Sequence, residues 1–177
     1  MKNKLNLTII FIVILALLVS CTPNNNKVQT PIIENDLGYG AVGSLSNDNI
    51  TIEQMLKYAI QDEYLARSEY EYIINEMNAT TPFTNIIKAE QTHIELLIPL
   101  FETYGFTLPV DTSKDHILVP NSLTAAYETG VQAEIDNIAM YDKFLSLDLP
   151  DDIREVFITL RDGSKNHLAA FERKLSR

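Results

Sequence analysis

The sequence predicts an all-α domain of four long helices, and three observations support this fold class. From residue 51 onward, apolar residues recur at the helical spacing of three and four positions in four successive segments. None of these segments shows the strict alternation of a half-buried strand. Capping residues, Pro and Gly stand where the ends of such helices would need them. At 177 residues, the chain is long enough to bury a core of its own.

The first twenty residues have the pattern of a secretory signal. Lysines precede an unbroken apolar run over residues 9–19, which is too short to span a hydrocarbon core of ~30 Å as a helix. The run ends in Leu18-Val19-Ser20-Cys21, which resembles a bacterial lipobox and implies lipid attachment at Cys21. An ordinary signal peptide that ends near a Cys is the alternative. We expect residues 1–20 to be a lipoprotein signal peptide, and Cys21 to anchor the protein to a bacterial membrane, outside the cytoplasm.

Residues 21–50 are rich in Asn, Gly, Pro and Ser and show no sustained period. This composition is typical of a flexible linker. We therefore expect a tether over residues 21–50 that joins the lipidated Cys to a four-helix domain over residues 51–177.

The first two helices are bounded by capping signals. Thr51, followed three positions later by Gln54, forms a capping-box pattern at the start of the first helix. The second helix is expected to begin at Pro82 and to stop at Gly105, since Pro suits the first turn and Gly suits the end. Their inward stripes include Met55, Leu56, Ala59, Ile60, Glu63, Tyr70 and then Phe83, Ile86, Glu90, His93, Leu97, Phe101.

The last two helices follow similar signals. The third is expected to begin after Ser122, and the fourth at Asp151 and Asp152, where acidic residues favour a helix N-terminus. Their inward stripes include Tyr127, Gly130, Glu134, Ile138, Tyr141 and then Ile153, Phe157, Leu160, Ser164, His167, Phe171.

The lengths of the connections predict how the helices are arranged. Short connections near residues 78–81 and 147–151 predict two antiparallel hairpins. Residues 106–121 lie between the hairpins, and an extended segment of that length reaches ~50 Å, enough to cross a bundle from end to end. Two antiparallel hairpins joined by a long crossover form a ferritin-like four-helix bundle.

Ionisable residues interrupt all four apolar stripes. Burying an unpaired carboxylate costs several kcal/mol, so a core that contains several carboxylates needs a compensating positive charge, such as a metal ion. Glu90 and His93, three positions apart, lie on one helical face. Di-iron and di-manganese bundles use one Glu from each of two helices and Glu-x-x-His from each of the other two. The predicted metal ligands are Glu63, Glu90, His93, Glu134 and His167.

The fourth helix departs from that pattern, because Ser164 stands three residues before His167 where a Glu would be expected. Five protein ligands remain, which leaves open one metal ion, two ions bridged by Glu90, or an asymmetric pair with the weaker ion beside His167. Tyr70, Tyr127 and Tyr141 also lie on the stripes; we expect packing roles for them, with hydrogen bonding to the metal site as the alternative.

The sequence around these residues resembles the DUF2202 family over roughly residues 50–175. The resemblance rests on Asp62-Glu63-Tyr64-Leu65-Ala66-Arg67, on Ala89-Glu90-Gln91-Thr92-His93 and on Leu160-Arg161-Asp162-Gly163-Ser164-Lys165-Asn166-His167-Leu168. It implies a bacterial or archaeal ferritin-like bundle of the dinuclear-iron type, in which Ser at position 164 is also usual. It implies no particular reaction.

Charge and composition limit the possible functions. With 24 acidic against 14 basic side chains, the net charge of −10 argues against nucleic-acid binding. Two functions remain: an iron protein that reacts with oxygen, peroxide or Fe(II), as an oxidase, peroxidase or ferroxidase, and a non-catalytic tethered binding or structural module. The second would contain a structural Zn or Mn ion or a metal-free polar core. The catalytic residues and the oligomeric state are left open.

Overall fold

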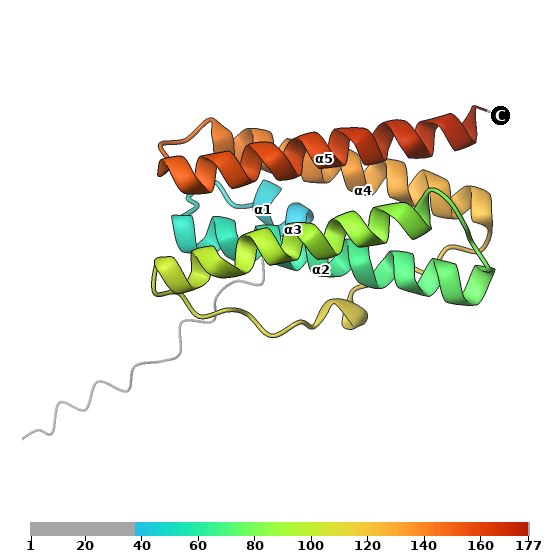
Figure 1. Ribbon diagram of the computed structural model, residues 1–177, viewed down its shortest axis with the longest axis horizontal. Coiled ribbons are helices and arrows are strands. Elements are labelled where there is room, and N and C mark those ends of the chain that lie inside the picture. Colours follow the sequence, from blue (N-terminus) through green and yellow to red (C-terminus); the bar gives the residue numbers. More distant parts are fainter. Residues whose placement is uncertain (1–37, 177) are drawn as a thin grey trace, which may run out of the picture. The chain divides into compact units, whose positions relative to one another are not determined.

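The structure is a computed structural model that describes residues 38–176, and helices dominate this part of the chain (Figure 1). Four long helices, α2 (Ile52–Met77), α3 (Phe83–Thr103), α4 (Leu123–Leu145) and α5 (Asp151–Leu175), follow a short helix, α1 (Gly40–Leu45). One turn of 3-10 helix, η1 (Ser113–Asp115), lies in the connection between α3 and α4. No strand occurs within the described residues, so the all-α prediction is confirmed there.

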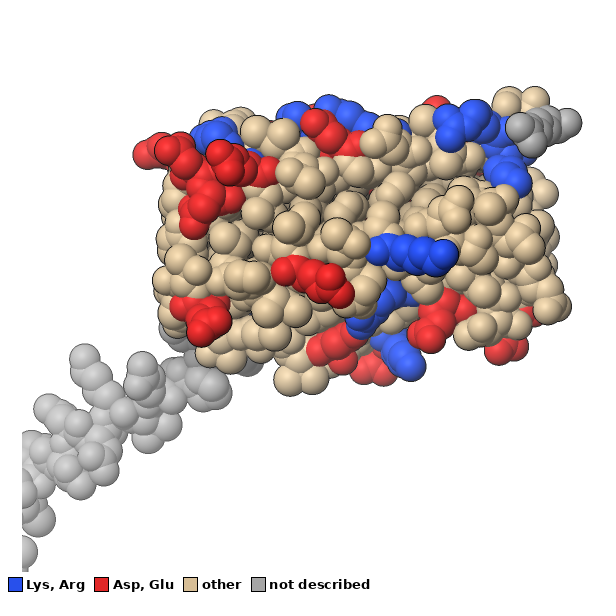
Figure 2. Space-filling model, in the orientation of Figure 1, with Lys and Arg blue, Asp and Glu red and all other residues tan. Residues whose placement is uncertain are grey.

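The long helices pack as two pairs. Within each pair, α2 with α3 and α4 with α5, the helices run in opposite directions (Figure 1). The pairs meet where α2 packs on α4 and α3 packs on α5. The connection from α3 to α4 runs along the helices, so α3 and α4 point the same way (Figure 1). On the face drawn in Figure 2, acidic and basic side chains are interspersed over a largely uncharged surface.

The helix ends follow the capping signals of the sequence. Thr51 and Gln54 form the expected capping box at the start of α2. Ser122 accepts a hydrogen bond from the backbone N–H of Ala125 at the start of α4. Asn78 adopts a left-handed conformation, with φ of 52°, at the end of α2.

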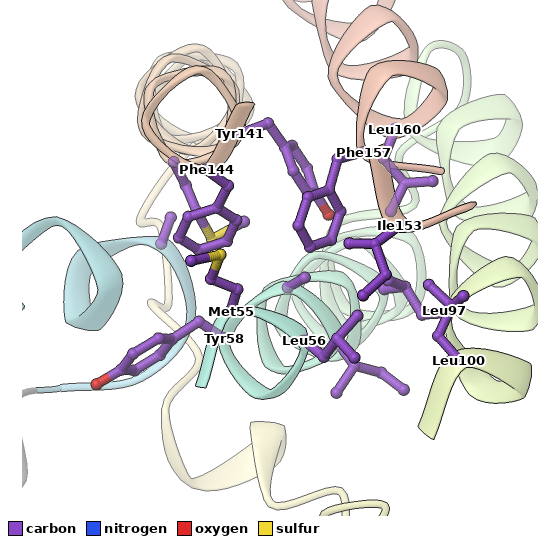
Figure 3. Close-up of a cluster of buried hydrophobic side chains, with 14 of the residues drawn as sticks. Met55, Leu56, Tyr58, Leu97, Leu100, Tyr141, Phe144, Ile153, Phe157 and Leu160 are labelled. Carbon is purple, nitrogen blue, oxygen red and sulfur yellow. The ribbon is translucent and has the colours of Figure 1, made fainter. Parts of the chain in front are cut away.

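Two apolar clusters lie at the two ends of the helices. The larger cluster gathers the first half of α2, the second half of α3, the second half of α4 and the first half of α5 (Figure 3). It includes Leu56, Ile60, Leu97, Tyr141, Phe144, Phe157 and Leu160. The smaller cluster gathers the opposite halves and includes Tyr70, Ile73, Phe83, Ile86, Ala126 and Phe171. The predicted ligands lie between the two clusters along each helix, so apolar side chains enclose them from both ends.

The predicted tether needs a correction for its last part. Gly40, Ala41, Gly43 and Ser44 are buried in α1, which packs on α2 and α4. Because α1 has only six residues, mostly small ones, its sequence shows no helical period, and its burial depends on tertiary contacts. The signal peptide, Cys21 and the first part of the tether lie outside the described residues. Within residues 38–176, no helix combines the length and the apolar character needed to cross a membrane.

Candidate metal centre

The five predicted ligands converge from all four long helices. Glu63 is on α2, Glu90 and His93 are on α3, Glu134 is on α4 and His167 is on α5. Each is buried, with at most 7% of its surface exposed. Their ligand atoms form two groups that share Glu90, Glu63–Glu90–His93 and Glu90–Glu134–His167, and within each group the atoms lie within 4.8 Å of one another.

Glu90 is the centre of this arrangement. Its Oε2 lies 3.0 Å from Nδ1 of His93, and its Oε1 lies 3.1 Å from Nδ1 of His167. Each histidine also faces a second carboxylate, with 3.0 Å from His93 Nδ1 to Oε2 of Glu63 and 3.5 Å from His167 Nδ1 to Oε1 of Glu134. One carboxylate oxygen of Glu90 therefore serves each group. Each group contains two glutamates and one histidine. The number of ligands therefore gives no reason for weaker metal binding beside His167, which the missing Glu at position 164 had suggested.

The proton equilibria show how the core tolerates three carboxylates. Burial alone would lower the pKa of His93, but the adjacent charge of Glu63 outweighs it and raises that pKa to about 10. Burial opposes protonation of His167 too, yet the carboxylates of Glu134 and Glu90 raise its pKa to about 10. Burial would raise the pKa of Glu90, but the two histidines lower it to about 2. The two histidine protons balance two of the three carboxylates. Burial raises the pKa of Glu63 to about 8 and also raises the pKa of Glu134, so a proton on one of these carboxyl groups removes the third charge when no metal is bound.

The donor set fits a metal ion. Nδ1 of His167 is buried and has no hydrogen-bond partner of suitable geometry, although two carboxylate oxygens lie near it. A buried polar atom without a partner is costly, and a cation between Nδ1 and those oxygens would satisfy it. Carboxylate and imidazole ligands suit iron, manganese and zinc.

Two tyrosines that we expected to pack also contact the predicted ligands. The hydroxyl of Tyr70 donates to Oε1 of Glu134 at 2.9 Å, and that of Tyr141 donates to Oε1 of Glu63 at 2.8 Å. Both rings are fully buried, so they pack and orient the carboxylates at once. Tyr127, by contrast, stacks on Phe83 with ring centroids 5.4 Å apart. The signal for Tyr70 was its position seven residues after Glu63, on the same face of the helix.

Ser164 belongs to a polar chain that the sequence did not predict. Its Oγ lies 2.6 Å from Oδ1 of Asn137, and Nδ2 of Asn137 donates to Oδ2 of Asp62 at 2.6 Å. The other oxygen of Asp62 accepts the backbone N–H of Ala41 at 2.7 Å. Asn137 stands three residues after Glu134, the same spacing as Glu90 and His93, which is the signal that could have revealed it. Ser164 thus links α5 to α4, α2 and α1, and it lies in neither ligand group.

Gly163 makes room for His93. A Cβ placed on Gly163 would lie 2.7 Å from Nε2 and 2.8 Å from Cε1 of His93, closer than real contacts allow. The His93 ring therefore packs against the backbone of α5, with Nδ1 turned toward Glu63 and Glu90. This contact explains why Gly directly precedes Ser164.

Comparisons with known proteins identify a family and a relative that this chain resembles. The profile of a family described as "Uncharacterized protein domain (DUF2202)" matches residues 52–177. The curated "Uncharacterized protein MJ0754" of Methanocaldococcus jannaschii is 29% identical over 131 residues, which cover 66% of this chain and 70% of that protein. A crystal structure of hypothetical protein MJ0754 from this archaeon superposes with a TM-score of 0.64 at 26% identity and covers 73% of this chain and 83% of that one.

Proposed function

We propose that this chain, which belongs to the DUF2202 family, is a ferritin-like metalloprotein that binds one or two iron ions through Glu63, Glu90, His93, Glu134 and His167. Its role is redox chemistry with oxygen, peroxide or Fe(II). The observation that carries the proposal is the shared carboxylate of Glu90, with one oxygen beside each histidine. The two antiparallel pairs and the long connection between them support the ferritin-like assignment.

The chain's own groups prepare the centre for a cation. Tyr70 and Tyr141 hold Glu134 and Glu63 in place by hydrogen bonds. Because the pKa of each histidine is about 10, a metal ion must displace a proton from each imidazole at neutral pH, and those protons leave to solvent. The apolar clusters on both sides restrict water and strengthen the attraction between the acids and a cation.

Iron bound there would supply electron exchange with a small oxidant, whereas Mn or Zn is the alternative for the same ligands. With five protein ligands for one or two ions, coordination positions stay open for a small molecule. An oxidase, a peroxidase and a ferroxidase, which takes Fe(II) as its substrate, are the activities that fit such a centre.

The experiment that tests the redox role is anaerobic loading of the protein with Fe(II), followed by exposure to oxygen or to peroxide. The proposal expects uptake of one or two Fe(II) per chain and a rise in near-ultraviolet absorption as Fe(II) becomes Fe(III). Rates that match those of free Fe(II) in the same buffer would contradict it. The variant Glu90→Gln is expected to lose uptake, whereas Glu102→Gln on the exposed face of α3 is the matched control.

We also propose that the mature protein is lipid-anchored through Cys21 on the outer side of a bacterial membrane. The support is the charged and apolar leader and the lipobox-like Leu18-Val19-Ser20-Cys21. Expression of the chain with Cys21→Ser should release it from the membrane fraction into the soluble fraction. Equal membrane recovery of the two forms would contradict the anchor.

One observation favours a second function, a tethered binding or structural module whose polar core needs no metal. His93 lies 3.0 Å from both Glu63 and Glu90, so a protonated imidazole ring can satisfy both carboxylates by itself. Unchanged thermal stability on addition of Fe(II), Mn(II) or Zn(II) would select this second function.

A further inference from the structure

A pocket outside the metal centre lies between α2 and α4, where α1 and the crossover close over them. Its volume is about 570 Å³, within the range of small-molecule sites. It is lined by Tyr39 and Val42 from the α1 segment, Glu69 from α2, and His116 and Leu118 from the crossover. Residues 38–51 lie outside the family match, so the family profile does not describe the part of the wall that they form.

The ionisable groups of the pocket are almost all acidic. Four carboxylates line it, those of Asp62, Glu69, Glu128 and Asp136. The other ionisable side chains of the lining are His116 and Tyr39, and the lining residues include no Lys or Arg. Burial raises the pKa of Glu69 and of Asp62 to about 7, so the wall carries its full negative charge well above pH 7, where it repels anions and favours a cation. None of these acids belongs to a group of three whose ligand atoms converge within 4.8 Å in the described part of the chain. The carboxylates are therefore spread around a space that suits an organic cation better than a bare metal ion.

Glu69 is the buried carboxylate of this wall. It is 4% exposed, and its Oε1 accepts the backbone N–H of Leu118 at 2.8 Å. Glu69 accepts no other hydrogen bond within residues 38–176, so its Oε2 is available to a ligand. Asp62 differs, because both of its oxygens already accept hydrogen bonds, from Ala41 and Asn137.

The other walls are aromatic and apolar. The rings of Tyr39 and His116 stack with centroids 4.1 Å apart, and an aromatic face attracts an ammonium group. Val42 and Leu118 are 62% and 65% exposed, so contact with an apolar ligand would remove apolar surface of both side chains from water. Leu65 and Ala133 complete the apolar lining.

We propose that this pocket binds a small organic ammonium ion with an apolar body, with Glu69 facing the charge and the Tyr39–His116 pair beside it. The pocket is a separate site from the metal centre, since none of the five predicted ligands lines it. Glu69 and Tyr39 are binding residues in this account, and α1 contributes a wall that forms only when residues 38–45 dock on α2 and α4.

The test is isothermal titration of the full-length chain with 2-phenylethylammonium and with its neutral analogue 2-phenylethanol. The ammonium ion should bind at one site per chain, and the alcohol at least about tenfold more weakly, since a hydrogen bond between charged groups is stronger than one to a neutral hydroxyl. Glu69→Gln keeps an oxygen that can accept the backbone N–H of Leu118 but removes the charge. It should therefore weaken binding of the ammonium ion about tenfold and leave binding of the alcohol nearly unchanged. Glu76→Gln, exposed on the same helix and outside this pocket, is the matched control.

A second variant, Thr129→Trp, places a large ring in the pocket and should abolish binding of both probes while the melting temperature stays near that of the parent. Equal affinity for the two probes would overturn the proposal, because it would make the pocket a site for neutral apolar ligands. Displacement of the probe by millimolar Mg²⁺ would overturn it in favour of a metal ion. Binding of neither probe, or binding unaffected by Glu69→Gln, would also overturn it.

Discussion

Replacement of Glu90 by Gln should destabilise the protein even when no metal is present. The carboxylate of Glu90 is 2% exposed, and its pKa is lowered from 4.5 to about 2 because the two histidines outweigh the effect of burial. A lowered carboxyl pKa contributes stability that is fully present above pH 4.5 and is lost as the pH falls through about 2, so the whole contribution is present at pH 7. A shift of this size corresponds to about 3 kcal/mol, in line with the cost of breaking a buried ion pair.

For a chain of this length, about 3 kcal/mol lowers the melting temperature by roughly 6–12 °C. The assay is thermal unfolding followed by circular dichroism at pH 7 with a chelator present. Glu102→Gln, an exposed replacement on the same helix, should melt within about 2 °C of the parent. A Glu90→Gln protein that melts as the control does would refute the reasoning, because the histidines would then gain nothing from the shared carboxylate.

Three further predictions concern the neighbours of Glu90. The stability of the metal-free protein should fall as the pH rises from about 6.5 to about 10. The raised pKa of both histidines contributes stability that is fully present below pH 6.5 and is lost as the pH rises to about 10. A denaturant midpoint that does not change with pH would contradict this. Gly163→Ala should displace the His93 ring, cost about 1–3 kcal/mol and disrupt the Glu63–Glu90–His93 group, so that metal titration finds fewer ions per chain or weaker binding than in the parent. The same number of ions bound at the same affinity as in the parent would show that the ring has room to move. Tyr141→Phe should cost about 1–3 kcal/mol, because Glu63 loses a buried donor, whereas Tyr127→Phe should cost far less; equal losses in chemical denaturation would argue for packing alone.

The long helices and the burial of the five candidate ligands could be predicted from sequence because both follow a local period. Glu63, Glu90, Glu134 and His167 occupy stripe positions that otherwise carry apolar residues, and helical geometry brings such positions inward. The burial of each one agrees with that reasoning.

The remaining features depend on contacts between distant segments. Helix α1 is buried by α2 and α4. Its six residues, mostly small ones, show no helical period from which the helix or its burial could be predicted. The hydrogen bonds from Ser164 through Asn137 to Asp62 join three long helices. The spacing of Asn137 from Glu134 places Asn137 on the inner face of its helix, but it does not reveal which residues of the other helices it contacts. The pocket beside Glu69 forms only because the α1 segment and the crossover both contribute residues to its walls, and these contacts between distant segments could not be predicted from the sequence.

The most direct test of the metal centre is a crystal structure of the iron-loaded protein, with anomalous data collected at the iron absorption edge. One or two anomalous peaks should lie beside the carboxylate of Glu90, each facing Nδ1 of His93 or His167. A fully loaded crystal with no peak beside Glu90, or with iron bound to surface acids alone, would contradict the assignment of these five residues as metal ligands.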